Sequence, residues 1–348
     1  MEETAMMIDM HAHWRPAELA DALRARTREP RILRNQDGVE VLKASRMGEE
    51  PLANAFDDVD FHLERMDRQG VETSVLSLLG SFCWIEAQPP EESVALCRTV
   101  NDGLSAICRK HPGRFAAYAA LPLTDMSAAV TEFERALGLP GMIGAQVPGN
   151  YFLTRKDAEA MRPLLAVANR RRAALFIHNG PRPGDAYPKI AADTDNARRR
   201  NGTLDMQASL SSVMVTLSLT DLLAEHPDAA IQVHNLGGNI PFEIERMDHR
   251  CLLDTPNEEL PSSCFRKAKV YVDCNSFGPR AIEAGVRLYG ADRIVCGTDG
   301  TEFGCDWTRK ALAEAEIGEE AREQILHRNA AAMLARARKT AQPATAAA

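Results

Sequence analysis

Long apolar runs and a basic amino terminus are both missing from this 348-residue chain. The longest mostly apolar stretch, residues 209–224, is interrupted by serine and threonine and falls short of the roughly 20 apolar residues that a membrane-spanning helix needs. The first three residues, Met1-Glu2-Glu3, are acidic where a secretory signal peptide requires positive charge. The sequence therefore predicts no membrane partner and a cytoplasmic location.

Excess positive charge and paired cysteines are also missing. The 41 lysines and arginines are outnumbered by 49 acidic residues, which gives a net charge of −8, and the densest basic cluster is only Arg198-Arg199-Arg200. Broad nucleic-acid binding needs a basic face, so we expect no nucleic-acid partner. The eight cysteines include no Cys-x-x-Cys pair, and we interpret them as reduced, mostly buried thiols.

What is present is an alternation of short apolar runs with helical patterns. The expected strands are 5–9, 73–79, 115–120, 142–147, 173–178, 230–234, 270–273 and 294–297. The clearest expected helices are 91–110, 128–137, 157–171, 206–225 and 279–288. Short, continuously apolar strands that alternate with helices are typical of a parallel sheet covered on both faces.

Eight such units predict an α/β fold, a closed (β/α)₈ TIM barrel. A length of 348 residues fits one barrel of about 200 to over 400 residues, although it would also fit two domains. An open doubly wound sheet is the alternative, but no glycine-rich phosphate loop follows the first strand. We expect one domain over residues 1–335, with an insertion or cap at 15–56 that includes a hairpin at Asp37-Gly38, and a low-complexity tail at 336–348.

Metal-binding residue types recur where expected strands end. His11 and His13 lie two residues apart near the first strand, so their side chains point to one face. His178 and His234 end the fifth and sixth strands, and Asp299 follows the eighth. The carboxyl ends of barrel strands meet at one face, where barrel enzymes have their active sites.

Taken singly, each of these residues is also explained by a hydrogen-bonded turn or a helix cap. One shared site explains why residues of these types occur at all of these strand ends. Three imidazoles and a carboxylate, from His11, His13, His178 and Asp299, suit Zn²⁺ or Mn²⁺. His234 is then left over as a group that can accept or donate a proton.

With these residues, the chain resembles the amidohydrolase superfamily, and within it the amidohydrolase-related group that contains 2-amino-3-carboxymuconate-6-semialdehyde decarboxylase. Besides the histidines and the aspartate, the resemblance includes the segments 63–71 (LERMDRQGV) and 111–115 (HPGRF). It also includes Gly237-Gly238 and Pro241-Phe242, which follow His234.

The resemblance implies roles for these residues. His11, His13, His178 and Asp299 would bind one divalent metal ion, most simply Zn²⁺, with Mn²⁺ as the other candidate. Asp299 and His234 would be catalytic, His234 as the acid and base. The expected fourth strand, 142–147, offers neither the lysine nor the glutamate that bridges two metals in binuclear members, which favours a single metal.

The resemblance also implies residues that bind substrate. Arg246 matches an arginine that holds a substrate carboxylate in a neighbouring subunit, which implies a homodimer; a surface salt bridge would equally explain this residue. Lys43 or Arg46 lies near a second carboxylate-binding arginine of the family, and we take Arg46 as the candidate. Apart from the resemblance, we take the aromatic residue Trp84 as a candidate for the pocket wall, with a place in the hydrophobic core as the alternative.

The function implied is non-oxidative, metal-dependent decarboxylation of an aromatic or unsaturated ring-cleavage carboxylic acid. Two residues beside the expected metal ligands depart from the pattern of the decarboxylases: Gly300 follows Asp299 in place of tyrosine, and Asn179 follows His178 in place of proline. A metal-dependent hydrolase or hydratase that acts on a lactone, a carbon–carbon bond or an alkene is therefore the alternative. A barrel that keeps a metal without catalysis is disfavoured. Structural metal sites usually have only protein ligands, whereas this set of ligands is accompanied by a spare base, His234.

Overall fold

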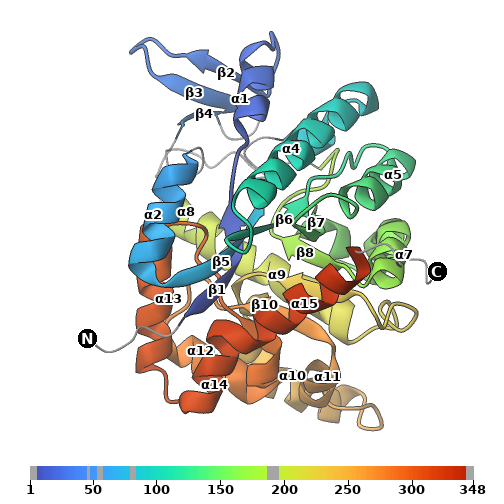
Figure 1. Ribbon diagram of the computed structural model, residues 1–348. Coiled ribbons are helices and arrows are strands. Elements are labelled where there is room, and N and C mark those ends of the chain that lie inside the picture. The colour runs from blue at the N-terminus through green and yellow to red at the C-terminus, as the bar shows by residue number, and fades with distance from the viewer. Residues whose placement is uncertain (1–5, 45–47, 53–57, 79–83, 186–195, 342–348) are drawn as a thin grey trace, which may run out of the picture.

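A computed structural model describes residues 6–44, 48–52, 58–78, 84–185 and 196–341. Its centre is a sheet of eight parallel strands in the order β1-β5-β6-β7-β8-β9-β10-β11 (Figure 1). These strands are β1 (Met7–His13), β5 (Val71–Ser77), β6 (Phe115–Ala119), β7 (Met142–Pro148), β8 (Ala174–His178), β9 (Ala230–Val233), β10 (Val270–Asp273) and β11 (Ile294–Val295). All eight overlap the strands expected from the sequence.

Two backbone hydrogen bonds join the last strand to the first. Met10 N donates to Cys296 O at 2.9 Å, and Thr298 N donates to His11 O at 3.3 Å. The sheet therefore closes on itself, and the predicted (β/α)₈ barrel is confirmed.

Helices surround this ring. The longer ones are α2 (Val59–Gln69), α4 (Pro90–Lys110), α5 (Met126–Ala136), α7 (Arg162–Arg171), α9 (Met206–Ser218), α10 (Ile240–Asp254), α12 (Pro279–Tyr289), α13 (Glu302–Glu314) and α15 (Asn329–Ala341). The shorter ones include α6 (Arg155–Ala158), α8 (Ala197–Arg199), α11 (Pro261–Lys267) and α14 (Glu319–Glu323). Within the described ranges, no helix has both the length and the apolarity to cross a membrane.

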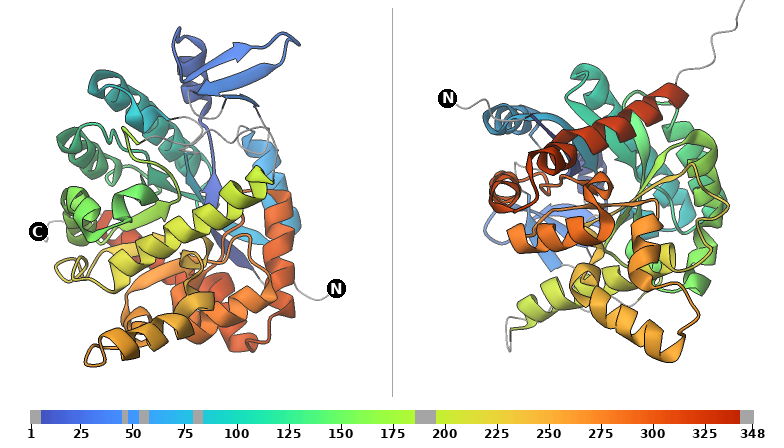
Figure 2. Two further views of the ribbon diagram at one scale, coloured as in Figure 1. Left: turned by 180° about the vertical axis from the view of Figure 1, so that it is seen from behind. Right: turned by 90° about the horizontal axis from the view of Figure 1, so that it is seen from below.

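The strands divide the apolar residues between two cores. Because successive side chains alternate between faces, one set fills the barrel interior, including Ile8, Met10, Tyr118 and Phe176. The other set packs against the helices. Helix α15 adds Ala330, Met333, Leu334 and Ala337 to the interior cluster and lies across the lower end of the barrel (Figure 2, right). This helix continues to Ala341, into the segment expected to be a low-complexity tail.

Most expected elements differ from the observed ones by one or two residues at an end, and three differ by more for a clear physical reason. The first strand runs through His13 rather than ending at residue 9, because its ladder with β5 continues to the pair His13–Ser77. The helix expected over 157–171 is broken by a 3₁₀ turn at Glu159–Met161, since Pro163 cannot donate to the carbonyl of residue 159. The helix expected to reach residue 225 ends at Ser218, followed by a turn in which Leu222 N donates to Thr220 Oγ1.

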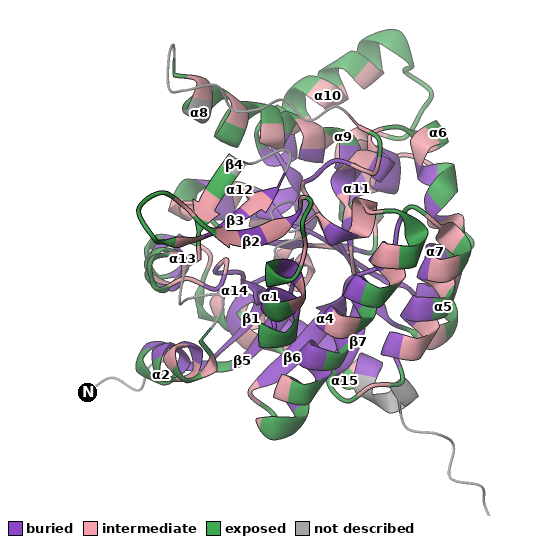
Figure 3. Ribbon diagram, turned by 90° about the horizontal axis from the view of Figure 1, so that it is seen from above, coloured by how far each residue is buried: buried purple, intermediate pink, exposed green. Residues whose placement is uncertain are grey.

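The segment after β1 forms a separate small layer. It contains α1 (Ala17–Arg24) and an antiparallel sheet of β2 (Arg31–Arg34), β3 (Glu40–Ala44) and β4 (Gly48–Pro51). The predicted hairpin at Asp37-Gly38 is confirmed: Gly38 has a φ of +75°, and Asn35 Oδ1 accepts from Val39 N at 2.9 Å. Figures 1 and 3 show this layer over the end of the barrel toward which β1 runs.

Candidate metal centre

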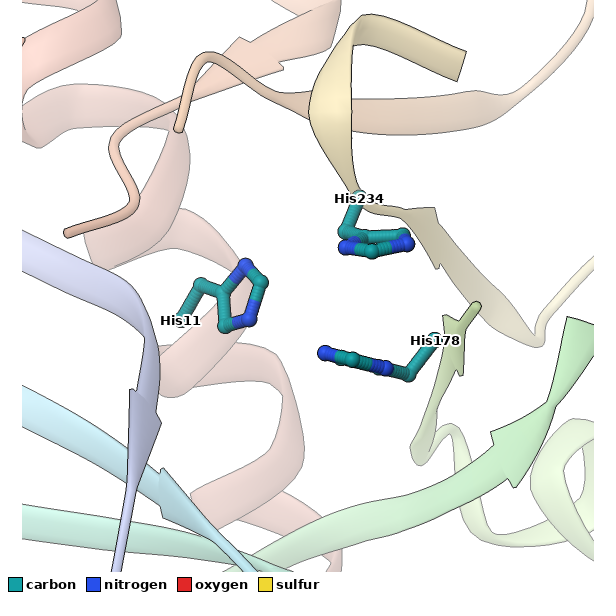
Figure 4. A group of neighbouring side chains, drawn as sticks. All are labelled: His11, His178 and His234. Carbon is teal, nitrogen blue, oxygen red and sulfur yellow. The ribbon is translucent and has the colours of Figure 1, made fainter. Parts of the chain in front are cut away.

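The groups predicted to bind metal lie together at the carboxyl ends of the barrel strands. His11 and His13 belong to β1, and His178 is the last residue of β8. His234 directly follows β9, and Asp299 lies in the turn after β11. Figure 4 shows His11, His178 and His234 reaching from three strands toward one another. The barrel therefore gathers residues that are almost 300 positions apart in the chain.

Hydrogen bonds leave the same nitrogen free in each of the three proposed histidine ligands. His11 Nδ1 donates to Asp273 Oδ2 at 3.1 Å, and His178 Nδ1 donates to the Asn179 carbonyl at 2.8 Å. His13 Nδ1 donates to Ser77 Oγ at 3.1 Å, whose own proton goes to the Ala12 carbonyl. Each imidazole therefore keeps an unprotonated Nε2, the form that binds a metal ion.

The free atoms meet at a small distance from one another. His11 Nε2 and His13 Nε2 are 3.3 Å apart, and Asp299 Oδ1 lies 3.4 Å and 3.1 Å from them. The ligand atoms of these three residues all lie within 4.8 Å of one another, as do those of His11, His178 and His234. Lone pairs and a carboxylate in such proximity repel unless a cation lies between them. The donor set therefore fits a divalent metal ion.

His234 differs from the other histidines of the centre. Its Nε2 accepts a hydrogen bond from Asn179 N at 2.8 Å, so the proton of the neutral imidazole is on Nδ1. His234 Nδ1 is buried and has no hydrogen-bond partner among the described residues. The ring stacks on that of His178, with 4.2 Å between the ring centroids. His234 thus offers a proton-bearing nitrogen where the other histidines offer a lone pair.

Burial and neighbouring charges set the ionisation of the centre. Burial, reinforced by the charges of His11 and His13, lowers the pKa of His178 to about 3. Burial likewise lowers the pKa of His234 well below its usual value, with His178 adding to the effect. Burial acts to raise the pKa of Asp299, but the neighbouring histidines, His13 first among them, lower it well below its usual range. Burial acts to lower the pKa of His11, but the neighbouring carboxylates, Asp273 first among them, raise it above its usual value. A neutral His178 and an ionised Asp299 are the forms that bind a cation, and the ion would displace a proton from His11.

The sequence reasoning missed a buried layer that supports His11. Asp273, the last residue of β10, also accepts from Gln232 Nε2 at 3.4 Å. Gln232 Oε1 in turn accepts from Tyr118 Oη at 2.8 Å, inside the barrel. All three side chains are fully buried. Polar residues inside apolar strands were the available signal, because a buried polar group needs a partner.

A second buried carboxylate holds the turn that carries Asp299. Asp9 Oδ1 accepts from Thr298 N at 3.1 Å, and the Thr298 hydroxyl also donates to Asp9. Asp299 itself has a φ of +60°, a left-handed backbone conformation that is uncommon outside glycine. The contacts of Asp9 thus fix a conformation that directs the Asp299 carboxylate toward His11 and His13.

Two of the three predicted substrate-binding residues are described, and they line different cavities. Trp84 lines a small cavity beside His178. Arg246 lies on the exposed face of α10 and lines a groove that α10 forms with α11. Arg46 falls outside the described residues, and the nearby Lys43 lies in β3, 3.6 Å from Glu49.

Two known decarboxylases are similar to this chain in sequence. Gamma-resorcylate decarboxylase of Rhizobium sp. (strain MTP-10005) is 28% identical over 283 residues, which cover 75% of this chain and 84% of the relative. The 2-amino-3-carboxymuconate-6-semialdehyde decarboxylase of Dictyostelium discoideum is 24% identical over 251 residues, with coverage of 70% and 66%.

Solved structures share the fold of this chain. The apo structure of Metarhizium anisopliae IDCase superposes with a TM-score of 0.78 at 19% identity, covering 95% of this chain and 97% of the other. A dihydroxybenzoic acid decarboxylase of Polaromonas sp. JS666, with bound manganese and the inhibitor 2-nitroresorcinol, has a TM-score of 0.65 at 21% identity, with coverage of 95% and 97%. The amidohydrolase family profile matches residues 8–336, and the chain therefore belongs to the amidohydrolase family.

Proposed function

We propose that this protein is a metal-dependent, non-oxidative decarboxylase of an aromatic or unsaturated carboxylic acid. The observation that carries the proposal is the division of the histidines by their hydrogen bonds. His11, His13 and His178 each present a bare Nε2, whereas His234 presents Nδ1–H. The two relatives described above are named as decarboxylases of such acids, which supports the same reaction class.

One divalent ion fits this donor set. His11, His13, His178 and Asp299 would hold it, and imidazole with carboxylate suits Zn²⁺ and Mn²⁺ alike. We take Zn²⁺ as the first candidate and Mn²⁺ as the second. When bound, the ion supplies positive charge that anchors substrate oxygen atoms.

The protein's own contribution is the placement of a proton. Loss of CO₂ breaks a carbon–carbon bond and leaves its electron pair on the carbon that carried the carboxylate. That carbon must take up a proton, which His234 would relay from solvent, since His234 is the histidine of the centre left outside the proposed ligand set. Asn179 N, which donates to His234 Nε2, keeps the proton on the opposite nitrogen. Asp299, as a ligand, would fix the substrate's position relative to His234.

The first test is His234→Ala. We expect full metal content, because His234 is not among the proposed ligands, and a loss of CO₂ release by a factor of about 10² to 10⁴, the usual contribution of a positioned acid or base. Elemental mass spectrometry and CO₂ assays on a panel of aromatic carboxylates measure both. His327→Ala, near the surface, is the matched control. Near-normal turnover by the His234 variant would overturn the assigned role.

The hydrolase or hydratase alternative uses the same centre and is less favoured, because the relatives named above are decarboxylases. The two reactions differ in the mass of the product. Decarboxylation removes CO₂, whereas hydrolysis or hydration adds the mass of one water molecule. Mass spectrometry of the product therefore separates them directly.

We also propose a homodimer in which Arg246 reaches the site of the neighbouring subunit and binds a substrate carboxylate. Arg246 is exposed on α10, and the same helix exposes the apolar side chains of Phe242, Leu252 and Leu253 by more than half. Exposed apolar residues on one helix are typical of a contact surface. We expect a dimer in light scattering and an Arg246→Ala variant with raised KM. An active monomer would exclude this arrangement.

The remaining proposals concern domain organisation and compartment. We propose that residues 1–335 act as one catalytic domain, with 15–56 as a cap, because the layer of α1 and β2–β4 lies over the end of the barrel that carries the metal centre.

A cytoplasmic location is supported by the cysteines: the seven that the structure describes are all free thiols.

A further inference from the structure

A small polar niche lies beside the metal centre, and nothing in the proposed mechanism uses it. We call it the Gln146 niche. It is lined by residues that follow β5 and β6, by the end of β7 and by the turn after β8: Trp84, Glu86, Ala87, Leu123, Gln146, Pro148, His178, Asn179, Gly180 and Pro183. His178 is a proposed metal ligand, and Asn179 N bonds to His234. The niche therefore adjoins the place where a substrate would react.

The sheet register directs Gln146 into the barrel. Gln146 pairs with Phe176 and Pro148 pairs with His178 in the parallel ladder of β7 and β8. Paired residues of parallel strands share a face, so Gln146 points inward with Phe176 and His178, one layer below the metal centre. Its Oε1 is buried and has no hydrogen-bond partner among the described residues. A buried acceptor without a partner is costly, unless a ligand or water supplies a donor.

The size of the niche limits what it can accept. Its volume is about 20 Å³. A water molecule needs about 10–15 Å³ of such space, so the niche holds one group of that size rather than a whole ring. A hydroxyl or an amino group on a ring has these dimensions, whereas a methoxy group is larger.

The charge of the niche favours a neutral substituent. Its described lining contains no lysine or arginine, so these residues offer no positive charge to a substrate carboxylate. Another polar residue of its lining is Glu86, in the 3₁₀ turn Ile85–Ala87. Burial raises the pKa of Glu86 to about 7, which leaves this carboxyl largely neutral below that pH. Both Gln146 and Glu86 supply oxygen atoms that can accept a hydrogen bond.

We propose that the Gln146 niche is a specificity site that selects a substrate whose ring carries a hydroxyl or amino group. The hydroxyl proton or one N–H donates to Gln146 Oε1, and an amino group has a second N–H for the Glu86 carboxyl. This rests on the proposed function for the identity of the reaction, but not for the existence of the niche. A site that hydrogen-bonds a substrate donor strongly rejects an analogue lacking that donor, because its buried acceptors are then left unpaired.

The test compares benzoates that differ in one ring substituent, with each ring position scanned: hydroxyl, amino, methyl and methoxy. For the best ring position we expect hydroxyl or amino to exceed methyl by at least about 100-fold in kcat/KM. Methyl matches the size but lacks the donor, and methoxy exceeds the size. Equal rates for hydroxyl and methyl would overturn the proposal.

Two variants locate the effect. Gln146→Leu keeps the volume and removes the acceptor, and we expect the hydroxyl-to-methyl preference to fall to within about tenfold, mainly through KM, with metal content unchanged. Glu86→Gln keeps an acceptor oxygen, so we expect it to retain most of the preference. Gln36→Leu, at an exposed turn position, makes the same chemical change outside the niche and serves as the control. A preference that survives Gln146→Leu would contradict the assignment.

A binding measurement separates this proposal from the proposed function. Isothermal titration of the manganese-loaded protein with phenol and with toluene compares a donor with its isostere without turnover. We expect tighter binding of phenol, and loss of that difference in Gln146→Leu. If no benzoate releases CO₂ but this difference is seen, the proposed function fails and the niche stands. If the two ligands bind equally, the niche proposal fails whatever the activity.

Discussion

The carboxylate of Asp273 decides which nitrogen of His11 faces the metal centre. It accepts from His11 Nδ1 at 3.1 Å and is itself held by Asn235 N at 3.0 Å and Asn275 N at 3.2 Å. A carboxylate can only accept in these contacts, so the proton of His11 stays on Nδ1 and Nε2 stays free. Partners of this kind orient metal ligands and raise their basicity.

Asp273→Asn tests this orientation. The amide presents both N–H and C=O groups, so it no longer enforces one form of the His11 imidazole. We expect the affinity for Zn²⁺ or Mn²⁺ to fall by about 10- to 100-fold. Competitive titration against a chromophoric chelator measures the change. Asp37→Asn, in the exposed turn between β2 and β3, should leave affinity unchanged, and an unchanged affinity in the Asp273 variant would contradict the argument.

At the scale of elements, the approach of β7 to β8 depends on a glycine. A Cβ at Gly144 would lie 2.1 Å from the carbonyl oxygen of Ala174 and 2.7 Å from its carbon. Those atoms belong to the backbone of the neighbouring strand, with which Gly144 is paired. They cannot move without disturbing the ladder. The same pairing continues to Gln146 and His178, so this close approach positions both the niche and a metal ligand.

Gly144→Ala should therefore destabilise the barrel. Forcing a methyl group into a packed interior typically costs about 1–3 kcal/mol, and backbone atoms yield less than side chains, so we expect at least the upper part of that range. Chemical denaturation measures the free energy of unfolding. Gly202→Ala is the matched control, because no atom lies within 4 Å of its added Cβ. Equal stability of the two variants would show that the ladder adapts.

At the scale of the whole molecule, the metal centre joins the first and the last strand of the barrel. His11 and His13 come from the first strand and Asp299 follows the last, while His178 comes from the middle of the ring. The same junction is also held by the two backbone hydrogen bonds that close the sheet and by the contacts of Asp9 with Thr298. An ion bound to all four groups would connect both sides of this junction and would bind the folded chain far better than the unfolded one.

Thermal denaturation with and without metal tests this link. At a free ion concentration of 100 times Kd, binding stabilises the folded state by about 2.7 kcal/mol, so we expect a clear rise in Tm. Chelator should reverse the rise, and His11→Ala should largely abolish it. A Tm that does not respond to Zn²⁺ or Mn²⁺ would mean that no stable site forms.

Much of the fold was predictable because its strands are short apolar runs punctuated by turns. The eight strands, the closed barrel, the hairpin at Asp37-Gly38 and the convergence of the strand-end histidines followed from that pattern. The ends of elements were less predictable. The ladder partner Ser77 extends β1 through His13, and Pro163 breaks a helical pattern that periodicity alone would continue.

The sequence by itself determined that His11, His13, His178, His234 and Asp299 meet at one end of a barrel, because the carboxyl ends of parallel strands share a face. Only the tertiary structure decided which nitrogen each histidine presents, since that depends on partners such as Asp273 and Ser77, from other strands. It also decided that Gln146 faces a water-sized niche beside His178. The direction of a side chain follows from strand register, and the room before it depends on packing between strands that are distant in the chain.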